Sequence, residues 1–302
     1  RMLEQVDVDK KMSKDEYEKK MESLSTRLGE LQRKCKEQKI PVMVTFDGVD
    51  AAGKGTMINR VTQFLDPRGY RVFTTGKAGE EEKMRPYFWR FFTKTPEKGR
   101  MHIFDQSWYR GVYEGEIGEK DATEFEKMLI QDGTLIVKFF LLISAKEQKK
   151  RLEKMEKDED TRWRVSDFDK WQNEHYKKCA KIFSQYLSDT NASSAPWYII
   201  DASDRKWAEL QVLETMVSNI EVAMQNQAHS VPILQNVFPL EQIPRLSDID
   251  LRDKTMDDEE YRGELKQLQS KLGELHNKLY RRRIPVIITY EGWDAAGKGG
   301  NI

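Results

Sequence analysis

Two glycine-rich segments of this chain each contain a lysine placed to bind phosphate. Residues 48–55 read GVDAAGKG and residues 292–299 read GWDAAGKG, each after an apolar run typical of a buried strand. Both fit the pattern G-x-x-x-x-G-K, in which backbone N–H groups surround phosphate groups and the lysine binds the outer ones. The first segment therefore predicts a phosphate or nucleotide site formed by Gly48, Ala51, Ala52, Gly53, Lys54, Gly55 and Thr56.

An acidic residue inside the loop is the second chemical candidate. The residue after Lys54 is Gly55, so the Ser or Thr hydroxyl that usually holds Mg²⁺ in such loops is missing. Asp50 could coordinate the metal or accept a proton instead, and Asp294 repeats it in the second segment. The alternative is that Asp50 caps the helix after the loop. We predict a catalytic, metal-binding role for Asp50.

A third candidate ends an apolar run about 50 residues further on. Residues 103–109 read IFDQSWY, which places Asp105 at the carboxyl end of an expected strand. An aspartate there is the Walker B arrangement, which puts a carboxylate beside Mg²⁺ and the phosphates. Strand-ending aspartates also form turns, but the loop upstream favours the catalytic and metal-binding role for Asp105. His102, within the same run, is interpreted as a core histidine.

Basic residues gather in two stretches that could neutralise phosphate charge. The first lies between the second and third expected strands, and the second lies between the fourth and fifth, which is where P-loop kinases carry a mobile lid. Closing arginines can stabilise charge on a transferring phosphoryl group and exclude water. We expect Arg162 to be catalytic and Arg85, Arg90, Arg110 and Arg164 to bind phosphate or nucleotide, whereas Lys149 and Lys150 form a solvated face. Ser166 and Asp169 fit a capping box that starts the next helix.

These residues need a scaffold of alternating strands and helices. Apolar runs predict strands at 41–47, 71–76, 101–105, 135–143 and 197–201, with helical stretches between them. This pattern is typical of an α/β fold with helices on both faces of a parallel sheet. The Walker pair predicts the order 2-3-1-4-5, which makes the 101–105 strand a neighbour of the 41–47 strand. A helix over 13–37 carries an apolar heptad stripe, which either forms a coiled coil or packs on its own domain.

The loop is part of a longer internal repeat. Lys54 and Lys298 differ by 298 − 54 = 244, and this offset holds without a gap back to Arg1 and Arg245. We expect a complete domain over 1–230 with a lid at about 145–187, a proline-containing linker over 231–244, and the truncated start of a second homologous domain over 245–302. The second loop should then lack its helix, its preceding strand should be disordered or pair with another chain, and Lys298 should bind no phosphate.

Composition narrows the class of protein. Lys+Arg 51 balance Asp+Glu 51, charged residues make up 34% of the chain, and no run approaches a membrane span. Net neutrality argues against a nucleic-acid binder, and the four histidines show no metal-ligand spacing. Two isolated cysteines and the lack of a signal peptide lead us to expect a cytoplasmic protein without disulfides.

Four motifs together resemble polyphosphate kinase family 2: residues 48–55, Trp89-Arg90, residues 104–109 and residues 161–165. The resemblance covers nearly all of residues 12–225, and the duplication is similar to its two-domain class, the polyphosphate:AMP phosphotransferases. It implies a P-loop kinase fold and Mg²⁺-dependent transfer between inorganic polyphosphate and a nucleotide, typically AMP giving ADP. It also implies that Asp50 and Asp105 are the metal-associated acids, that Lys54 binds phosphate and that Arg162 lies in the lid.

Two positions depart from that family. Arginine usually follows the Walker B aspartate and recurs shortly after the Ser-Trp-Tyr, whereas this chain has Gln106 and Gly111, with Arg110 next door. In the two-domain class the N-terminal copy is often degraded. Three functions therefore stay open: a polyphosphate-dependent nucleotide kinase, a non-catalytic phosphate-binding or dimerisation domain, and an ATP-dependent nucleoside monophosphate kinase. We expect a homo-oligomer or pairing with the second copy.

Overall fold

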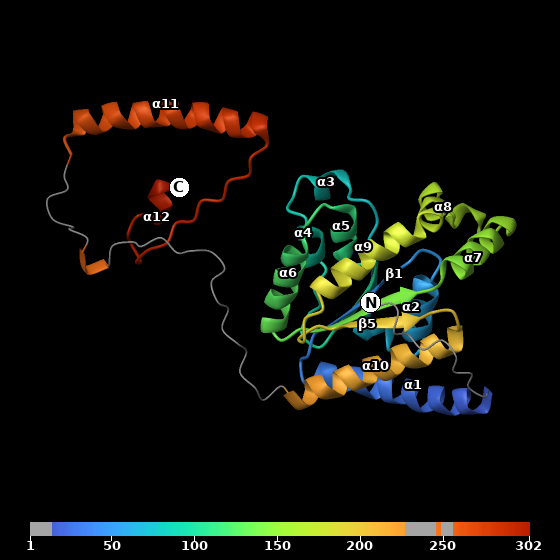
Figure 1. Cartoon of the computed structure of the whole chain (residues 1–302). Coiled ribbons are helices and arrows are strands. Elements are labelled where there is room, and N and C mark those ends of the chain that lie inside the picture. Colours follow the sequence, from blue (N-terminus) through green and yellow to red (C-terminus); the bar gives the residue numbers. More distant parts are fainter. Residues whose placement is uncertain (1–13, 227–245, 249–255) are drawn as a thin grey trace. The chain divides into compact units, whose positions relative to one another are not determined.

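The computed structural model describes residues 14–226, 246–248 and 256–302 (Figure 1). The chain divides into two compact units, Arg1–Leu234 and Gln235–Ile302. The expected linker over 231–244 lies outside the described residues.

The first unit is built on one parallel sheet of five strands, which are β1 (Val42–Gly48), β2 (Tyr70–Thr74), β3 (Met101–Asp105), β4 (Leu135–Leu142) and β5 (Trp197–Asp201). Their order is β2-β3-β1-β4-β5, so the predicted order 2-3-1-4-5 is confirmed. The strands at 101–105 and 197–201 have the predicted bounds, and the other three differ by one or two residues at one or both ends. In the register of β1 and β3, Phe46 lies opposite Asp105, which puts the two chemical motifs side by side.

Two long helices lie along one face of this sheet (Figure 1). They are α1 (Lys14–Glu37) and α10 (Arg205–Asn226), which pack against each other. The α1 stripe buries Leu28 and Leu31 completely, and each such leucine contributes about 1.5–3 kcal/mol. The heptad stripe therefore packs on its own domain.

Helices α5 (Tyr109–Glu114), α6 (Glu119–Gln131) and α9 (Tyr176–Asp189) cover the opposite face (Figure 1). Beneath them the fully buried Lys138 of β4 places its Nζ 2.8 Å from Glu126 Oε2 and 3.0 Å from Tyr109 Oη. Burial lowers the pKa of Lys138 and raises that of Glu126, and the attraction between the two charges opposes both shifts. A buried pair of this kind contributes little net stability, but either partner left alone would be costly.

Shorter helices connect the strands on the side where the chemical motifs lie. The chain runs from β1 into α2 (Lys54–Thr62), and from β4 into α7 (Ala145–Lys157). The remaining short elements are η2 (Pro67–Gly69), α3 (Glu80–Lys83), α4 (Trp89–Phe92), η3 (Arg162–Arg164) and α8 (Asp167–Glu174). Ser166 and Asp169 form the predicted capping box at the start of α8.

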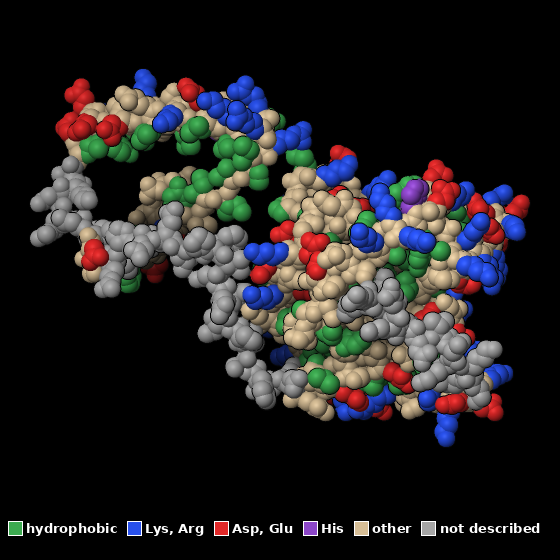
Figure 2. Space-filling model, viewed as in Figure 1, with side chains coloured by type: hydrophobic (Ala, Val, Ile, Leu, Met, Phe, Trp, Pro, Cys, Tyr) green, Lys and Arg blue, Asp and Glu red, His purple; other side chains and the backbone are tan. Residues whose placement is uncertain are grey.

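The second unit contains η4 (Leu246–Asp248), α11 (Asp258–Arg282) and α12 (Lys298–Asn301). Its apolar side chains lie along one side of α11, where Leu268 and Leu272 are 62% and 64% exposed (Figure 2). The apolar run over 284–290 forms no strand and is exposed. None of the helices that the structure describes is long and apolar enough to cross a membrane.

The expectation that the second loop lacks its helix is wrong, because α12 begins at Lys298. Lys298 Nζ lies 2.9 Å from Gly292 O and 2.8 Å from Trp293 O, the same pair of carbonyls that Lys54 contacts in the first loop. Whether Lys298 binds phosphate stays a prediction.

Candidate active site

The first loop joins β1 to α2 in a conformation that its glycines require. Gly48 has φ 140°, and a Cβ there would lie 2.2 Å from Leu141 O, so no larger residue fits. Gly53, with φ 96°, is the N-cap of α2 and no side chain caps this helix. The interpretation of Asp50 as a helix cap is therefore wrong. The N–H groups of the first turn of α2 lack intrahelical partners and favour an anion.

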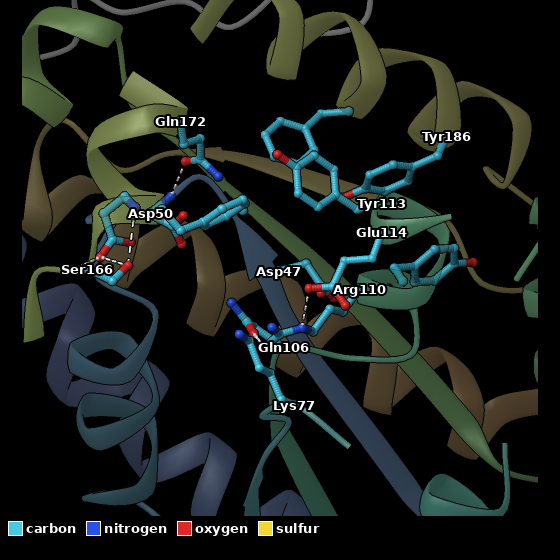
Figure 3. A pocket seen from close by; sticks show the side chains of 15 residues that line it. Asp47, Asp50, Lys77, Gln106, Arg110, Tyr113, Glu114, Ser166, Gln172 and Tyr186 are labelled. Carbon is cyan, nitrogen blue, oxygen red and sulfur yellow. Dashed lines mark hydrogen bonds and ion pairs between the residues drawn. The ribbon is translucent and has the colours of Figure 1, made fainter. Parts of the chain in front are cut away.

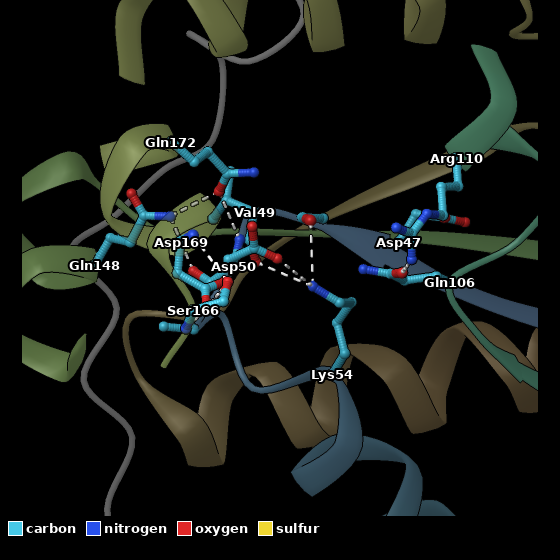
Figure 4. A network of polar contacts seen from close by, with 12 residues as sticks. Asp47, Val49, Asp50, Lys54, Gln106, Arg110, Gln148, Ser166, Asp169 and Gln172 are labelled. Atoms are coloured by element: carbon cyan, nitrogen blue, oxygen red, sulfur yellow. Dashed lines mark hydrogen bonds and ion pairs between the residues drawn. The ribbon is translucent and has the colours of Figure 1, made fainter. Parts of the chain in front are cut away.

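The loop lysine is held at the centre of the site. Lys54 Nζ lies 3.3 Å from both Gly48 O and Val49 O, and 3.7 Å from Asp50 Oδ1 (Figure 4). Its side chain is only 10% exposed. The ammonium group is therefore fixed beside the loop, where it can attract a phosphate oxygen.

Both predicted metal-binding acids lie close to this lysine. Asp105 ends β3, and its Oδ2 lies 3.8 Å from the position that a Cβ on Gly55 would take. Burial raises the pKa of Asp105, and the Lys54 charge partly offsets this shift. Burial also raises the pKa of Asp50, Lys54 lowers it, and the neighbouring Asp169 carboxylate raises it further.

Two carboxylates beside one lysine can hold a hard cation. Asp50 Oδ2 is buried and has no hydrogen-bond partner, which leaves it available for a ligand. Within the described part of the chain, no group of three or more His, Cys, Asp or Glu side chains could hold a metal ion. Mg²⁺ often takes only one or two carboxylates from the protein, with water and substrate phosphates as its other ligands. Asp50 and Asp105 therefore fit Mg²⁺.

A cavity of about 600 Å³ opens at the start of α2, which we call the basic pocket. Its four cationic side chains, after which we name it, are Lys54, Arg151, Lys154 and Arg164. Four carboxylates, those of Asp50, Asp105, Asp158 and Asp169, and the loop residues Ala51, Gly53, Gly55 and Thr56 also line it. No aromatic side chain is among the described residues that line this pocket. Arg164 stacks over the Trp163 ring at 5.2 Å.

The two predicted lid arginines occupy different places. Arg164 lines the basic pocket, whereas Arg162 lies outside it, 60% exposed and 3.4 Å from Glu159. Ala52 does not line the pocket either, but its carbonyl accepts a hydrogen bond from Arg151 at 3.2 Å. Arg151 thus holds the main chain of the loop through hydrogen bonds to its carbonyl groups.

A second cavity of about 380 Å³, the aromatic pocket, lies on the other side of Asp50 (Figure 3). Its walls come from α5, α8 and α9, and Tyr113 stacks on Phe183 with ring centroids 4.9 Å apart. Asp50 and Asp169 line both pockets, so the two cavities meet at these carboxylates. The aromatic residues that line it are Tyr109, Tyr113, Phe168, Phe183 and Tyr186. Of these only Tyr109 lies in one of the family motifs of the sequence.

The other predicted arginines divide between the pocket walls and the surface. Arg110 and Lys77 line the aromatic pocket and also a smaller adjoining cavity, which Arg90 lines too. Arg90 is 8% exposed, donates to Gly76 O at 3.0 Å and has a buried Nε without a hydrogen-bond partner. Arg85 lies apart, 3.0 Å from Glu81 and over the Trp89 ring.

The two positions that depart from the family, Gln106 and Gly111, have different surroundings. A Cβ on Gly111 would lie 2.4 Å from Tyr87 Cζ, so the Tyr87 ring occupies the space that a side chain at 111 would need. Gln106 has φ 62°, and its Oε1 accepts a hydrogen bond from Arg110 Nη1 at 3.0 Å. Arg110 is also held by Thr75 O at 3.1 Å and Glu114 at 2.9 Å.

The remaining histidine prediction is confirmed. His102 is buried in β3, and its Nδ1 lies 2.8 Å from Lys94 O. Burial lowers its pKa, which favours the neutral ring of a core histidine.

Comparison with known proteins gives one family. A sequence profile described as Polyphosphate kinase 2 matches residues 11–228 and 255–302. The polyphosphate:AMP phosphotransferase of Pseudomonas aeruginosa is 32% identical over 320 residues, covering 100% of this chain and 64% of that protein. NDP-polyphosphate phosphotransferase 3 of Ruegeria pomeroyi is 33% identical, covering 73% of this chain and 77% of that protein.

A solved structure described as a polyphosphate kinase 2 from Pseudomonas aeruginosa has a TM-score of 0.71 and 30% identity. It covers 75% of this chain and 51% of that chain. The chain thus spans less than two thirds of the length of the phosphotransferase from the same organism.

Proposed function

Because this chain belongs to the polyphosphate kinase 2 family, we propose that its first unit transfers a phosphoryl group between inorganic polyphosphate and a nucleotide, with AMP as the preferred acceptor. The AMP preference draws on the relatives named for that acceptor, whereas other relatives are named for nucleoside diphosphates. The acceptor is therefore the part of the proposal that most needs an experiment.

The single observation that carries the proposal is the chemical difference between the two pockets. The basic pocket offers four cations and loop N–H groups but no aromatic side chain among the described residues that line it, which suits a polyphosphate chain better than an ATP donor. Of its four carboxylates, Asp50 and Asp105 would face Mg²⁺ rather than the phosphates directly. The aromatic pocket offers stacked rings for a nucleobase. The cavities meet at Asp50 and Asp169, so a terminal phosphate in one would face an acceptor phosphate in the other.

Each chemical residue then has a role in charge neutralisation. Phosphoryl transfer needs little covalent help from the protein and depends on positioning and on stabilising charge at the equatorial oxygens. Lys54 would hold the transferring phosphate, and Arg164 would approach it from the lid side of the basic pocket. Arg110 lies on the acceptor side. Arg162 would contribute only if the lid moves, since its side chain faces solvent.

Mg²⁺ would be held by Asp50 and Asp105. When bound it would supply positive charge beside the phosphate oxygens, and it would oppose the burial that raises the pKa of both carboxyls. Asp50 Oδ2 is buried without a hydrogen-bond partner, so a bound cation would compensate for its lost solvation.

A paired substitution tests this assignment. Tyr113→Leu removes a stacked ring from the aromatic pocket and should raise KM for AMP by about tenfold or more, since stacking on a base contributes about 1–3 kcal/mol. It should leave KM for polyphosphate unchanged. Lys154→Ala, in the basic pocket, should show the opposite pattern. Equal effects of both variants on both substrates would contradict the division of the pockets.

A non-catalytic first unit is the second candidate, and Gly111 favours it. The Tyr87 ring fills the space beside Gly111 where the family usually has an arginine, so one cation of the site is replaced by packing. A transfer assay with polyphosphate and AMP on the first unit alone and on the full-length protein separates the two candidates. Transfer that needs the second unit would support the non-catalytic function.

A further inference from the structure

We propose that Gln148 and Gln172 form a latch that ties the lid helix α8 to the phosphate loop and keeps Asp50 in its binding position. The proposal rests on the proposed function for its kinetic consequence and for the binding of phosphate at the first loop. Neither glutamine belongs to the charged constellation described above, and Gln148 lines neither of the two pockets.

The latch binds both main-chain polar groups of Asp50 (Figure 4). The N–H group of Asp50 donates to Gln172 Oε1 at 2.8 Å. The carbonyl of Asp50 accepts from Gln148 Nε2 at 3.0 Å, and the same Nε2 lies 2.8 Å from Gln172 Oε1. Two side chains from different helices thus clamp a single loop residue.

Because both glutamine side chains are buried, the loss of any of these hydrogen bonds is costly. Gln148 is fully buried and Gln172 is 2% exposed, so water cannot replace a hydrogen bond that is lost. Asn173 Nδ2 donates to Gln148 Oε1 at 2.9 Å and to Ala145 O at 2.9 Å, which fixes the orientation of the Gln148 amide. Asp50, Gln148, Gln172 and Asn173 therefore form one hydrogen-bond network, in which the loss of one side chain leaves polar groups of the others unpaired.

The position of α8 links the latch to both pockets. The same helix carries Asp169, which lines both pockets, and it follows the segment that brings Arg164 to the basic pocket. Undocking of α8 would free the N–H of Asp50 and let the loop peptide rotate, which would displace the Asp50 carboxylate from Lys54. By linkage, an anion that orders the loop must also stabilise the docked lid. Gln148 and Gln172 are thus positioning residues that act through Asp50.

The experiment compares three glutamine-to-methionine variants of the full-length protein. Gln148→Met and Gln172→Met keep the side-chain length and remove the amide. Gln32→Met is the matched control, because Gln32 is also buried and also binds both main-chain groups of one aspartate, Asp66, at 2.7 and 3.1 Å. Asn173→Ala is a milder variant that removes the brace on Gln148 should the buried substitutions prevent folding.

Hydrogen exchange of residues 166–175 is measured with and without inorganic tripolyphosphate, a probe that needs no transfer chemistry. We expect tripolyphosphate to slow this exchange severalfold in the parent protein and in Gln32→Met, but not in the two latch variants. Asn173→Ala should show a reduced effect. Protection that persists in Gln148→Met, or that is absent from the parent protein, would overturn the latch.

The kinetic arm tests the consequence for catalysis. Both latch variants should lose between about tenfold and a hundredfold in kcat, as expected when a catalytic group is displaced by an ångström, with KM for polyphosphate changed much less. The double variant should lose no more than the worse single variant, because both act on one peptide. A loss shared by Gln32→Met would indicate general destabilisation and contradict the proposal. If the parent protein transfers no phosphate at all, the proposed function fails while the exchange result still decides the latch.

Discussion

The Asp47 carboxylate accepts two hydrogen bonds from Ser107, one from the backbone N–H at 3.0 Å and one from the hydroxyl at 2.7 Å. Asp47 lies just before the phosphate loop, and Ser107 lies just after Asp105. Both side chains are buried, and burial raises the pKa of Asp47 while the bonds from Ser107 oppose this shift. The contact therefore sets the separation between the two chemical motifs where β1 and β3 end.

Ser107→Ala should lower the free energy of unfolding. The substitution leaves one oxygen of a buried carboxylate without its hydroxyl partner, which costs about 1–3 kcal/mol. Denaturant unfolding measures the loss. The double variant with Asp47→Ala should lose less unfolding free energy than the sum of the two single losses, because both substitutions remove the same contact. Full additivity would mean that the contact contributes nothing.

Replacement of Lys54, Asp50 or Asp105 by alanine should each lower kcat on the order of a hundredfold or more, as the loss of charge-stabilising groups typically does. The measurement is initial-rate transfer from polyphosphate to AMP. Lys150→Ala is the control, since Lys150 is an exposed cation that pairs with Glu147 at 3.7 Å. Near-parental rates in all three variants would move the catalysis to the other unit.

The two unusual positions make a matched pair. Gln106→Arg should raise the transfer rate if the first unit is a weakened enzyme, because it restores a cation where the family usually has one. An unchanged rate would point to the non-catalytic function. Gly111→Arg should instead destabilise the fold by about 1–3 kcal/mol, the usual cost of overpacking, because Tyr87 fills the space beside Gly111. A Gly111→Arg protein as stable as its parent would show that Tyr87 moves aside.

Asp105→Asn should raise Tm while it removes activity. Burial raises the pKa of Asp105, so the folded state holds its proton more tightly than the unfolded chain does. The parent therefore loses stability as pH rises from about 4, the usual pKa of an unfolded aspartate, through the raised folded-state value.

The Tm difference between Asp105→Asn and its parent should grow over that range and level off above it. Each kcal/mol corresponds to about 2–4 °C in a domain of this size. Differential scanning calorimetry in EDTA avoids a contribution from bound metal. A gain that is constant across pH would show that the carboxylate charge is not its cause.

The strands could be predicted from the sequence because apolar runs mark them. Motifs also single out Asp50, Lys54 and Asp105, which the fold brings together, but their roles stay a prediction. The strands at 101–105 and 197–201 end at an aspartate after an apolar run, so their bounds match. The 71–76 strand was predicted to start one residue too late and to end two residues too late. Thr75 is a buried residue beyond the strand, and its N–H donates to Asp105 O at 2.9 Å.

The aromatic pocket and the latch could not be found in this way. Tyr113 and Phe183 come from helices 70 residues apart, and in the sequence each looks like an ordinary core residue. Gln148 and Gln172 lie in helices rich in charged residues, where a glutamine carries no spacing signal. Only the fold shows that their amides converge on Asp50. Arg162 and Arg164 share a motif, and only the fold shows that Arg164 lines the basic pocket whereas Arg162 does not.

The second loop repeats the first in detail, although no strand lies among the described residues of its unit. Ala51 and Ala295 have φ of 61° and 60°, Gly53 and Gly297 have φ of 96° and 84°, and both lysines fold back on the same two carbonyls. The information for this conformation is therefore contained within about eight residues, and the sheet adds burial and a neighbouring acid. In evolutionary terms such a segment is a portable backbone conformation. A duplicated segment of this length keeps its backbone conformation, and the residues around each copy can then change independently.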